Sequence, residues 1–424
     1  MNIFARHLGM RYNLRVNPIR SYLLTLHSFG RNARLYVLFS FVSGFSIAVY
    51  SLFFNLYILS LGKSSSFLGI LVALPMAMNL LFALPAGLLA DRIGYRRGLL
   101  LGTTLTIASI VGIALSSSIS GLILFSVVSG LGNSLIWVVG APFMMENSLE
   151  EGRMHLFSVQ FSMNTFSGFF GFLIGGSLPG LFARYLRIPS GGPVPYRVTL
   201  LVSAGLMAVA LIPLFLLHKS KREGHSEAIH PREAFADTGL TARLLIPEIV
   251  IGLGAGLLVP YFNVFFKQTF SVSDGLLGTL FAGQSIAIGI ATLTAPLLAA
   301  RWGKIRAVAA TQLASIPFLL LLGYSNLLTV AAVGFLARAA LMNMGGPLYS
   351  AFAMERIAPQ RRAAVNGILT MSWSGSFALS NWVSGNLQGT VGFSPLFLLT
   401  CIAYVIGASL TYIFFARIDT RGSD

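Results

Sequence analysis

The sequence predicts an all-α membrane protein of twelve transmembrane helices, built as two six-helix bundles with both termini in the cytoplasm. Three observations lead to this fold class: a very apolar composition, a series of uncharged runs of helix length, and an internal repeat. Hydrophobic residues make up 55% of the 424 residues and charged residues only 10%. Soluble domains carry about a quarter charged residues, so a water-soluble fold is excluded.

Uncharged runs mark the helices, because a helix needs about 20 apolar residues to cross the hydrocarbon layer. Five runs fit one crossing each, three longer runs are divided by turn-forming clusters, and a run containing only Glu248 completes the set. The single runs are 35–62, 64–90, 154–183, 198–217 and 275–300, the double runs are 98–145, 307–354 and 363–416, and the last is 244–266.

An internal duplication divides the chain into two halves of six helices. The repeated positions, all 209 residues apart, are Leu68-Gly69 with Leu277-Gly278, Arg92 with Arg301, Gly94 with Gly303, Glu146 with Glu355, and Arg153 with Arg362. An even number of helices brings both copies into the membrane from the same side, so the halves are parallel repeats. The predicted organisation is a basic segment 1–34, a first bundle 35–217, a linker 218–242, a second bundle 243–416 and a tail 417–424.

The distribution of Lys and Arg predicts the orientation, since cationic loops stay in the cytoplasm. Of the 29 Lys and Arg residues, 23 fall on the side that carries both termini. We therefore expect a multi-pass protein of the inner or plasma membrane. The net charge of +16 fits the lipid bilayer as a partner and needs no nucleic acid.

A basic motif follows the second predicted helix: Gly87-Leu88-Leu89-Ala90-Asp91-Arg92-Ile93-Gly94-Tyr95-Arg96-Arg97. It resembles the Gly-x-Leu-Ala-Asp-Arg-x-Gly-x-Arg signature of the major facilitator superfamily, with Tyr95 where that family often has Arg. The resemblance implies two bundles around a cleft that opens to either side in turn. Gly87 would let helices approach closely, Gly94 would permit a tight turn, and Asp91 would cap a helix of the other bundle and so latch the cytoplasmic side. In the second half Ala300 stands where Asp91 does, so the latch should be one-sided.

Each half also carries a Glu followed seven residues later by an Arg, at the cytoplasmic end of the fourth or tenth helix. These pairs resemble the charge networks of superfamily members, sugar porters among them, that close the inner gate. Ordinary helix-end charges are the alternative, and an exposed pair contributes only about 0 to 1 kcal/mol. The predicted gating residues are Gly87, Asp91, Arg92, Gly94, Arg96, Glu146, Arg153, Arg301, Glu355 and Arg362.

Arg338 is the leading candidate for substrate contact, because it lies midway along the tenth helix, where a charge is costly unless it faces a cavity or a partner. The alternative is a structural arginine held by neighbouring polar groups. In the superfamily fold the first, fourth, seventh and tenth helices are central, and the fifth, eighth and eleventh helices lie beside them. Their polar or aromatic residues, each with helix packing as its alternative role, are Tyr50, Asn55, Asn133, Trp137, Asn164, Tyr261, Asn263, Gln284, Asn343, Trp373 and Asn381. Glu248 is expected near the inner surface, and Asp274 as a helix N-cap.

We expect a monomeric secondary transporter working by alternating access on a small molecule. One basic and no clearly buried acidic residue in the central helices favours an anionic or a neutral solute and leaves the coupling ion open. No phosphate-binding loop, metal-spaced His or Cys cluster or nucleophile motif is present, so we expect no enzyme, cofactor or metal. A multidrug or amphiphile exporter, favoured by 33 Phe and 13 Met, is one alternative. A non-transporting receptor or assembly factor, with a cleft filled by side chains, is another.

Overall fold

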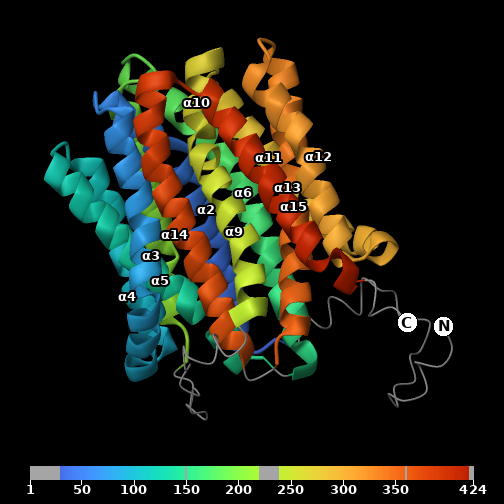
Figure 1. The fold of residues 1–424 in the computed structure, drawn as a ribbon. Coiled ribbons are helices and arrows are strands. Elements are labelled where there is room, and N and C mark those ends of the chain that lie inside the picture. The colour runs from blue at the N-terminus through green and yellow to red at the C-terminus, as the bar shows by residue number, and fades with distance from the viewer. Residues whose placement is uncertain (1–28, 149, 219–237, 359–360, 420–424) are drawn as a thin grey trace, which may run out of the picture.

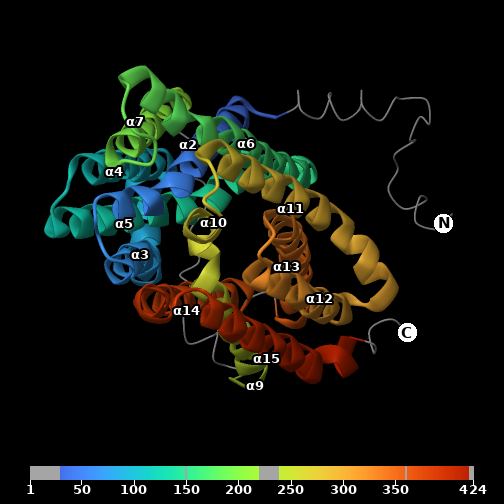
Figure 2. The same ribbon diagram turned by 90° about the horizontal axis from the view of Figure 1, so that it is seen from above.

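The computed structural model describes residues 29–148, 150–218, 238–358 and 361–419, which are almost entirely helical. Most of the predicted basic N-terminal segment, most of the linker and the end of the tail lie outside these residues. The helices form two groups that stand side by side, with α2 to α8 in one and α9 to α15 in the other (Figures 1 and 2). The predicted two-bundle architecture is thereby confirmed.

The first bundle consists of α2 (Arg31–Ser60), α3 (Ser65–Ile93), α4 (Tyr95–Leu115), α5 (Ile119–Glu146), α6 (Glu150–Leu186), α7 (Pro193–Val209) and the short α8 (Leu211–Phe215). The second consists of α9 (Thr238–Leu258), the 3₁₀ turn η3 (Val259–Tyr261), α10 (Phe262–Phe270), α11 (Asp274–Trp302), α12 (Lys304–Tyr324), α13 (Leu328–Arg356), α14 (Arg362–Val391) and α15 (Ser394–Asp419). We call the face where α2 begins and α15 ends the terminal face, drawn at the bottom of Figure 1, and the other the opposite face.

Eleven helices of the described chain are long and apolar enough to cross a membrane, counting α7 with α8 and α9 with α10 as one crossing each. The twelfth predicted crossing, α14, is 30 residues long but has a more polar sequence rich in Ser, Asn and Gly. Five of its polar residues, Ser374, Ser376, Ser380, Asn381 and Ser384, are buried, and α14 lies along both α9 and α3. The eleven apolar crossings and α14 together give the twelve-helix fold that the sequence predicts.

The seventh crossing is broken at Pro260, which lies in the 3₁₀ turn between α9 and α10. Proline lacks a backbone N–H and clashes with the carbonyl four residues earlier, so the α-helical pattern stops there. Across the turn the chain changes direction slightly and continues as α10, which lies near the centre of the molecule in the view from above (Figure 2). The break frees carbonyl groups at membrane depth, where water cannot satisfy them.

The hydrophobic core shows how the two bundles meet. Toward the opposite face, one continuous cluster joins residues of both bundles, from Leu52 and Leu68 to Phe262 and Tyr404. Toward the terminal face the core divides into one cluster confined to the first bundle and another confined to the second. The bundles are therefore packed together at the opposite face and separate toward the terminal face.

Candidate functional site

Two asparagines seal the opposite half of the space between the bundles. Asn55 on α2 donates from Nδ2 to the Pro260 carbonyl at 2.6 Å and to the Asn263 Oδ1 at 3.0 Å. Asn263 on α10 donates in return to the Leu52 carbonyl at 2.9 Å. Both side chains are buried, and the Pro260 carbonyl freed by the helix break is one of their acceptors. Both sequence candidates thus join the bundles in the described state.

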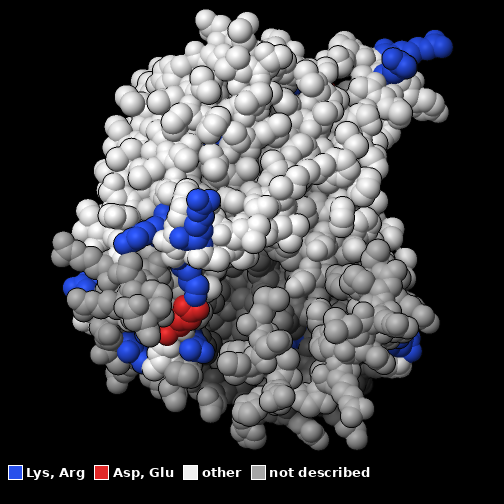
Figure 3. All heavy atoms as spheres, turned by 90° about the vertical axis from the view of Figure 1, so that its right-hand side faces the viewer, with Lys and Arg blue, Asp and Glu red and all other residues white. Residues whose placement is uncertain are grey.

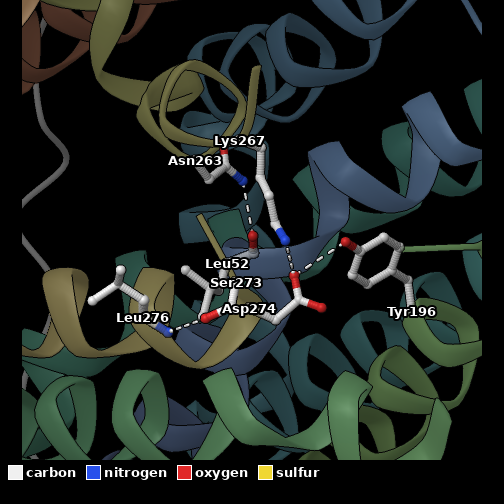
Figure 4. A network of polar contacts seen from close by, with 7 residues as sticks. All are labelled: Leu52, Tyr196, Asn263, Lys267, Ser273, Asp274 and Leu276. Carbon is white, nitrogen blue, oxygen red and sulfur yellow. Dashed lines mark hydrogen bonds and ion pairs between the residues drawn. The ribbon is translucent and has the colours of Figure 1, made fainter. Parts of the chain in front are cut away.

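A second polar contact crosses the bundles closer to the opposite face. Asp274 at the start of α11 forms an ion pair with Lys267 of α10 at 2.5 Å and accepts a hydrogen bond from Tyr196 of α7 at 3.1 Å. Figure 4 shows Lys267 and Tyr196 reaching Asp274 from two sides. The predicted N-cap role of Asp274 is wrong: Ser273 caps α11 by accepting from the Leu276 N–H at 3.3 Å. The Asp274 carboxylate instead links the two bundles by accepting the hydrogen bond from Tyr196.

Four glycines allow the bundles to touch backbone to backbone, because a glycine has no side chain to separate two helices. A Cβ placed on Gly69 of α3 would lie 2.8 Å from the Gly385 Cα of α14, and one on Gly278 of α11 would lie 2.6 Å from the Gly176 Cα of α6. The two crossings are related by the repeat, since Gly69 matches Gly278 and Gly176 matches Gly385 at the offset of 209. The opposite face is therefore closed by two symmetric helix crossings.

Several sequence candidates keep exposed side chains, Trp137 of α5 among them. Trp137 lies on the side turned away from α4, where Gly132 and Leu135 pack, and 77% of its surface is exposed. The other sequence candidates that keep exposed surface are amides and aromatics: Tyr50, Asn133, Asn164, Gln284, Asn343 and Trp373. They come from α2, α5, α6, α11, α13 and α14, which are six of the seven helices predicted to line a cleft.

Arg338 does not belong to this exposed set. Only 3% of its surface is exposed, its guanidinium donates to the Tyr404 hydroxyl of α15, and it lies over the rings of Phe262 (5.4 Å) and Tyr404 (5.6 Å). Among the described residues its Nε has no hydrogen-bond partner and its guanidinium forms no ion pair. The geometry is that of an arginine held inside the second bundle, the alternative that the sequence left open.

Tyr261 and Asn381 also pack within the second bundle. The Tyr261 hydroxyl donates to the Asn381 carbonyl at 2.8 Å, and in its hydrogen-bonded orientation the Asn381 amide donates to the Gly256 carbonyl at 2.8 Å. Gly256 is the residue four before Pro260, whose missing N–H leaves that carbonyl without its helical partner. These two residues therefore support the helix break rather than the open space. Glu248, placed by the sequence near the inner surface, lies partly buried on α9.

At the terminal face, the loop motif forms the turn that the sequence predicts. Gly94 has φ +88°, and its repeat counterpart Gly303 has φ +84°, a conformation that favours glycine. Arg96 donates to the Phe215 carbonyl at 2.6 Å and so holds the end of α8. Gly87 makes no close helix contact here, since a Cβ would lie 3.6 Å from Val138, an ordinary distance.

Two of the predicted gating charges, Glu355 and Arg362, make contacts within their own bundle. Glu355 is paired with Lys304 of its own bundle, and the Arg362 Nε donates to the Ile357 carbonyl at 3.2 Å, also within the second bundle. Among the described residues, the buried Arg153 Nε has no hydrogen-bond partner and Glu146 forms no ion pair. Arg301, at the end of α11, lies on the outer side of the second bundle beside Trp302 and Arg306.

Sequence reasoning found Asn55 and Asn263 but missed the Lys267 and Tyr196 contacts and the glycine crossings at the opposite face. Lys267 and Tyr196 stand at helix ends where a charge or a hydroxyl is unremarkable, and only the fold brings them to Asp274. The glycine crossings left a visible signal, since both pairs fall on the repeat offset. No cluster of three or more His, Cys, Asp or Glu that would suit a metal occurs among the residues that the structure describes.

Two helical bundles that meet at one face and part at the other around polar and aromatic side chains define a membrane protein of the solute-carrier class. The sequence matches the Major Facilitator Superfamily over residues 36–247 and again over residues 244–423. The chain belongs to this family of transporters, as the loop motif predicts. No curated protein matches it at a significant level.

Solved structures agree with this assignment. The nucleoside transporter NupG is similar with a TM-score of 0.72 and 15% identity, over 91% of this chain and 98% of that one. A bacterial homolog of the human lysosomal transporter Spinster, inward-facing and occupied, is similar with a TM-score of 0.71 and 16% identity, over 94% of this chain and 97% of that one. At such identities the likeness shows the fold alone.

Proposed function

We propose that the chain is a secondary transporter that carries a small solute by alternating access, and that the described state is open to the cytoplasm. The observation that carries the proposal is the division of the core: one cluster spans both bundles at the opposite face, and two separate clusters occupy the terminal half. Parallel repeats of this kind rock about a fixed central site. The excess of Lys and Arg on the terminal side supports a cytoplasmic terminal face.

The substrate class that the exposed side chains favour is a small uncharged polar solute. Asn133, Asn164, Gln284 and Asn343 offer amide donors and acceptors, with Trp137 and Trp373 as flat apolar surfaces. Arg338 was the reason to expect an anionic substrate from the sequence, but its side chain is buried within the second bundle. Nucleosides combine a flat ring with uncharged polar groups, and a nucleoside transporter is among the similar structures, so nucleosides are the first solutes to test.

An amphiphile exporter is the second candidate. The Trp137 side chain presents a large aromatic surface, 77% exposed, that an apolar group of a ligand would cover. The two candidate substrate classes differ in how much their binding depends on the amide side chains. A polar solute needs their hydrogen bonds, while an amphiphile needs mainly the aromatic surface.

The gate at the terminal face is proposed to close by exchange of ion pairs. Lys304 holds Glu355 in the open state. When the bundles approach, Glu146, Arg153 and Arg362 come within reach of the other half, and Asp91 meets the start of α14, as the family resemblance implies. Each exposed pair contributes about 0 to 1 kcal/mol, so several are needed to offset the free energy of separating the bundles at the opposite face.

A thermal-shift screen on the purified protein tests the substrate class. The panels are nucleosides, neutral sugars, organic anions and amphiphilic cations, and the variants are Asn133→Ala and, as a matched control, Asn326→Ala in the α12–α13 loop. A ligand at about 100 times its Kd adds about 2.7 kcal/mol to the folded state. We expect a neutral panel to stabilise the wild type and the control but not Asn133→Ala. Stabilisation by anions alone would contradict the proposed class, and stabilisation by amphiphiles in all three proteins would favour the exporter.

A further inference from the structure

A groove on the outer side of the second bundle joins two arginines to a strip of small and apolar residues. It has a volume of about 380 Å³ and is lined by Arg301, Trp302, Arg306, Ala309, Ala310, Leu313 and Tyr412. The arginines stand at the end of α11 and the start of α12, the level at which the apolar spans end. Ala309 and Ala310 form the floor of the groove, and α15 contributes Tyr412 as a wall.

Among the side chains that the structure describes, no carboxylate lines the cationic end of the groove. Among the described residues, neither Arg301 nor Arg306 forms an ion pair, and the nearby Glu355 is taken by Lys304. Both arginines are exposed, so they are available to a ligand. Figure 3, which views the side of the molecule on the right of Figure 1, shows Lys and Arg gathered around one small acidic patch, below a band with almost no charged side chains.

The other end of the groove suits a hydrocarbon chain. Leu313, about two helical turns beyond Arg306 toward the membrane centre, is 39% exposed, and Tyr412 is 49% exposed beside it. Trp302 is 46% exposed at the level of the arginines. Trp and Tyr prefer the boundary between headgroups and hydrocarbon, where an apolar ring meets water. A ligand that fits must therefore be anionic at one end and apolar at the other.

The repeat places a related cavity in the first bundle. Arg92, Arg97 and Leu100 correspond to Arg301, Arg306 and Ala309 at the offset of 209, and they line a cavity of about 550 Å³. There Phe215, His218 and Glu146 complete the walls, and Arg96 is occupied by the end of α8. The lining of the first cavity thus includes a carboxylate and the end of α8, while the second is lined by α11, α12 and α15.

We propose that the groove between α12 and α15 is a binding site for one anionic phospholipid. The phosphate lies between Arg301 and Arg306, and an acyl chain runs over Ala309, Ala310 and Leu313. Basic pockets between transmembrane helices on the cytoplasmic side are suited to such headgroups. This assignment does not depend on which solute the protein carries.

Native mass spectrometry of the delipidated full-length protein tests the site. The probes are phosphatidylglycerol, phosphatidylcholine and soluble sn-glycerol 3-phosphate. The variant Arg301→Gln/Arg306→Gln removes the cationic end, and Arg184→Gln/Arg187→Gln removes two exposed arginines from the opposite face as a control of equal charge. Each arginine near an anionic surface contributes about a factor of 5, so the first variant should bind phosphatidylglycerol about 30-fold more weakly. The control should bind it as the wild type does.

A third variant, Ala310→Phe, fills the groove without changing its charge and should also lose the tightly held lipid. It keeps the test decisive if the double arginine variant does not fold. Equal affinity of wild type, Arg301→Gln/Arg306→Gln and Ala310→Phe for phosphatidylglycerol would overturn the proposal. So would equally tight binding of phosphatidylcholine, which lacks the net charge. Displacement of the lipid by sn-glycerol 3-phosphate at equal concentration would also overturn it, because the site would then bind phosphate without needing the chain.

Discussion

At the scale of single residues, the crossed amides of Asn55 and Asn263 are the contact on which closure of the opposite face depends most. Each amide is buried and bonded to the other bundle. A buried polar group that loses its partner costs about 1 to 3 kcal/mol, which changes a two-state equilibrium about 5- to 150-fold. The bundles should therefore separate at this face when one amide is removed.

Asn263→Ala tests this directly. We expect the variant to populate the state that is open at the opposite face, because the Leu52 carbonyl loses its donor and the Asn55 amide loses one of its two acceptors. Spin labels on Ser64→Cys of α3 and Gly389→Cys of α14, in a Cys401→Ser background, report the distance across this face. Asn386→Ala, whose amide bonds only its own helix, is the matched control and should leave the distance unchanged. Equal distances in both variants would remove the amides from the gate.

Asp274→Asn should act in the same direction, because it weakens the hydrogen bond from Tyr196 of the first bundle and leaves Lys267, in the same bundle as Asp274, without its ion pair. Breaking a buried pair costs about 3 to 5 kcal/mol, and here less, about 1 to 3 kcal/mol, because Lys267 remains 21% exposed. The double variant Lys267→Gln/Asp274→Asn leaves no unpaired charge and should recover part of the closed population. The same spin-label pair measures both. A double variant that is as open as the single one would show that the charge pair is not what holds the face.

Tyr404→Phe should destabilise the second bundle, since the hydroxyl is the hydrogen-bond partner of the buried Arg338 guanidinium. A hydrogen bond to a charged group contributes about 1.5 to 3 kcal/mol, so the thermal midpoint should fall. Tyr185→Phe, at an 82% exposed residue, is the control and should leave it unchanged. If Arg338→Met instead abolishes solute stabilisation while the ligand-free midpoint stays that of the wild type, Arg338 contacts the substrate after all.

At the scale of the helices, the closed face depends on two crossings that admit no side chain. Gly385→Ala would place a Cβ 2.5 Å from the Gly69 Cα, and α3 would have to move away from α14. Overpacking of this kind costs about 1 to 3 kcal/mol. We expect the labelled opposite face to widen, while Gly367→Ala on the same helix, which has open space around it, should not change it. An unchanged distance in Gly385→Ala would mean that the crossing is not tight in the membrane.

The sequence predicted these helices well because crossing a membrane imposes a length and a composition that few other folds share. It did equally well with the repeat and the family. It did less well with the seventh crossing, predicted as one run over 244–266, which is broken at Pro260 and extends from α9 to α10.

The site was predictable only as a set of polar residues at membrane depth. Whether such a residue faces the open space or its own bundle depends on the rotation of its helix, which a single sequence does not reveal. Arg338 and Asn343 lie five residues apart on α13, yet one is buried against Tyr404 and the other is exposed. Polar contacts across the bundles, such as the hydrogen bond from Tyr196 to Asp274, depend on tertiary structure and on the state of the transporter.

At the scale of the whole molecule, we propose that the described structure is one of the two states that alternating access requires. In this proposal, the contacts at the opposite face stabilise the described state. The charged residues at the terminal face stabilise the other state, in which that face is closed. A solute that binds between the bundles should favour the state that surrounds it, and by linkage the state should set the affinity for the solute.

The most direct test measures both faces of the same protein in proteoliposomes. One spin-label pair is placed at the terminal face, Met145→Cys on α5 with Ser350→Cys on α13, and the other is the Ser64→Cys with Gly389→Cys pair at the opposite face. Alternating access predicts a long terminal distance with a short opposite one, a minor population with the two reversed, and a shift between them when a transported solute is added. A single fixed distance at each face, unchanged by every solute panel, would contradict alternating access and favour a non-transporting membrane protein on the same fold.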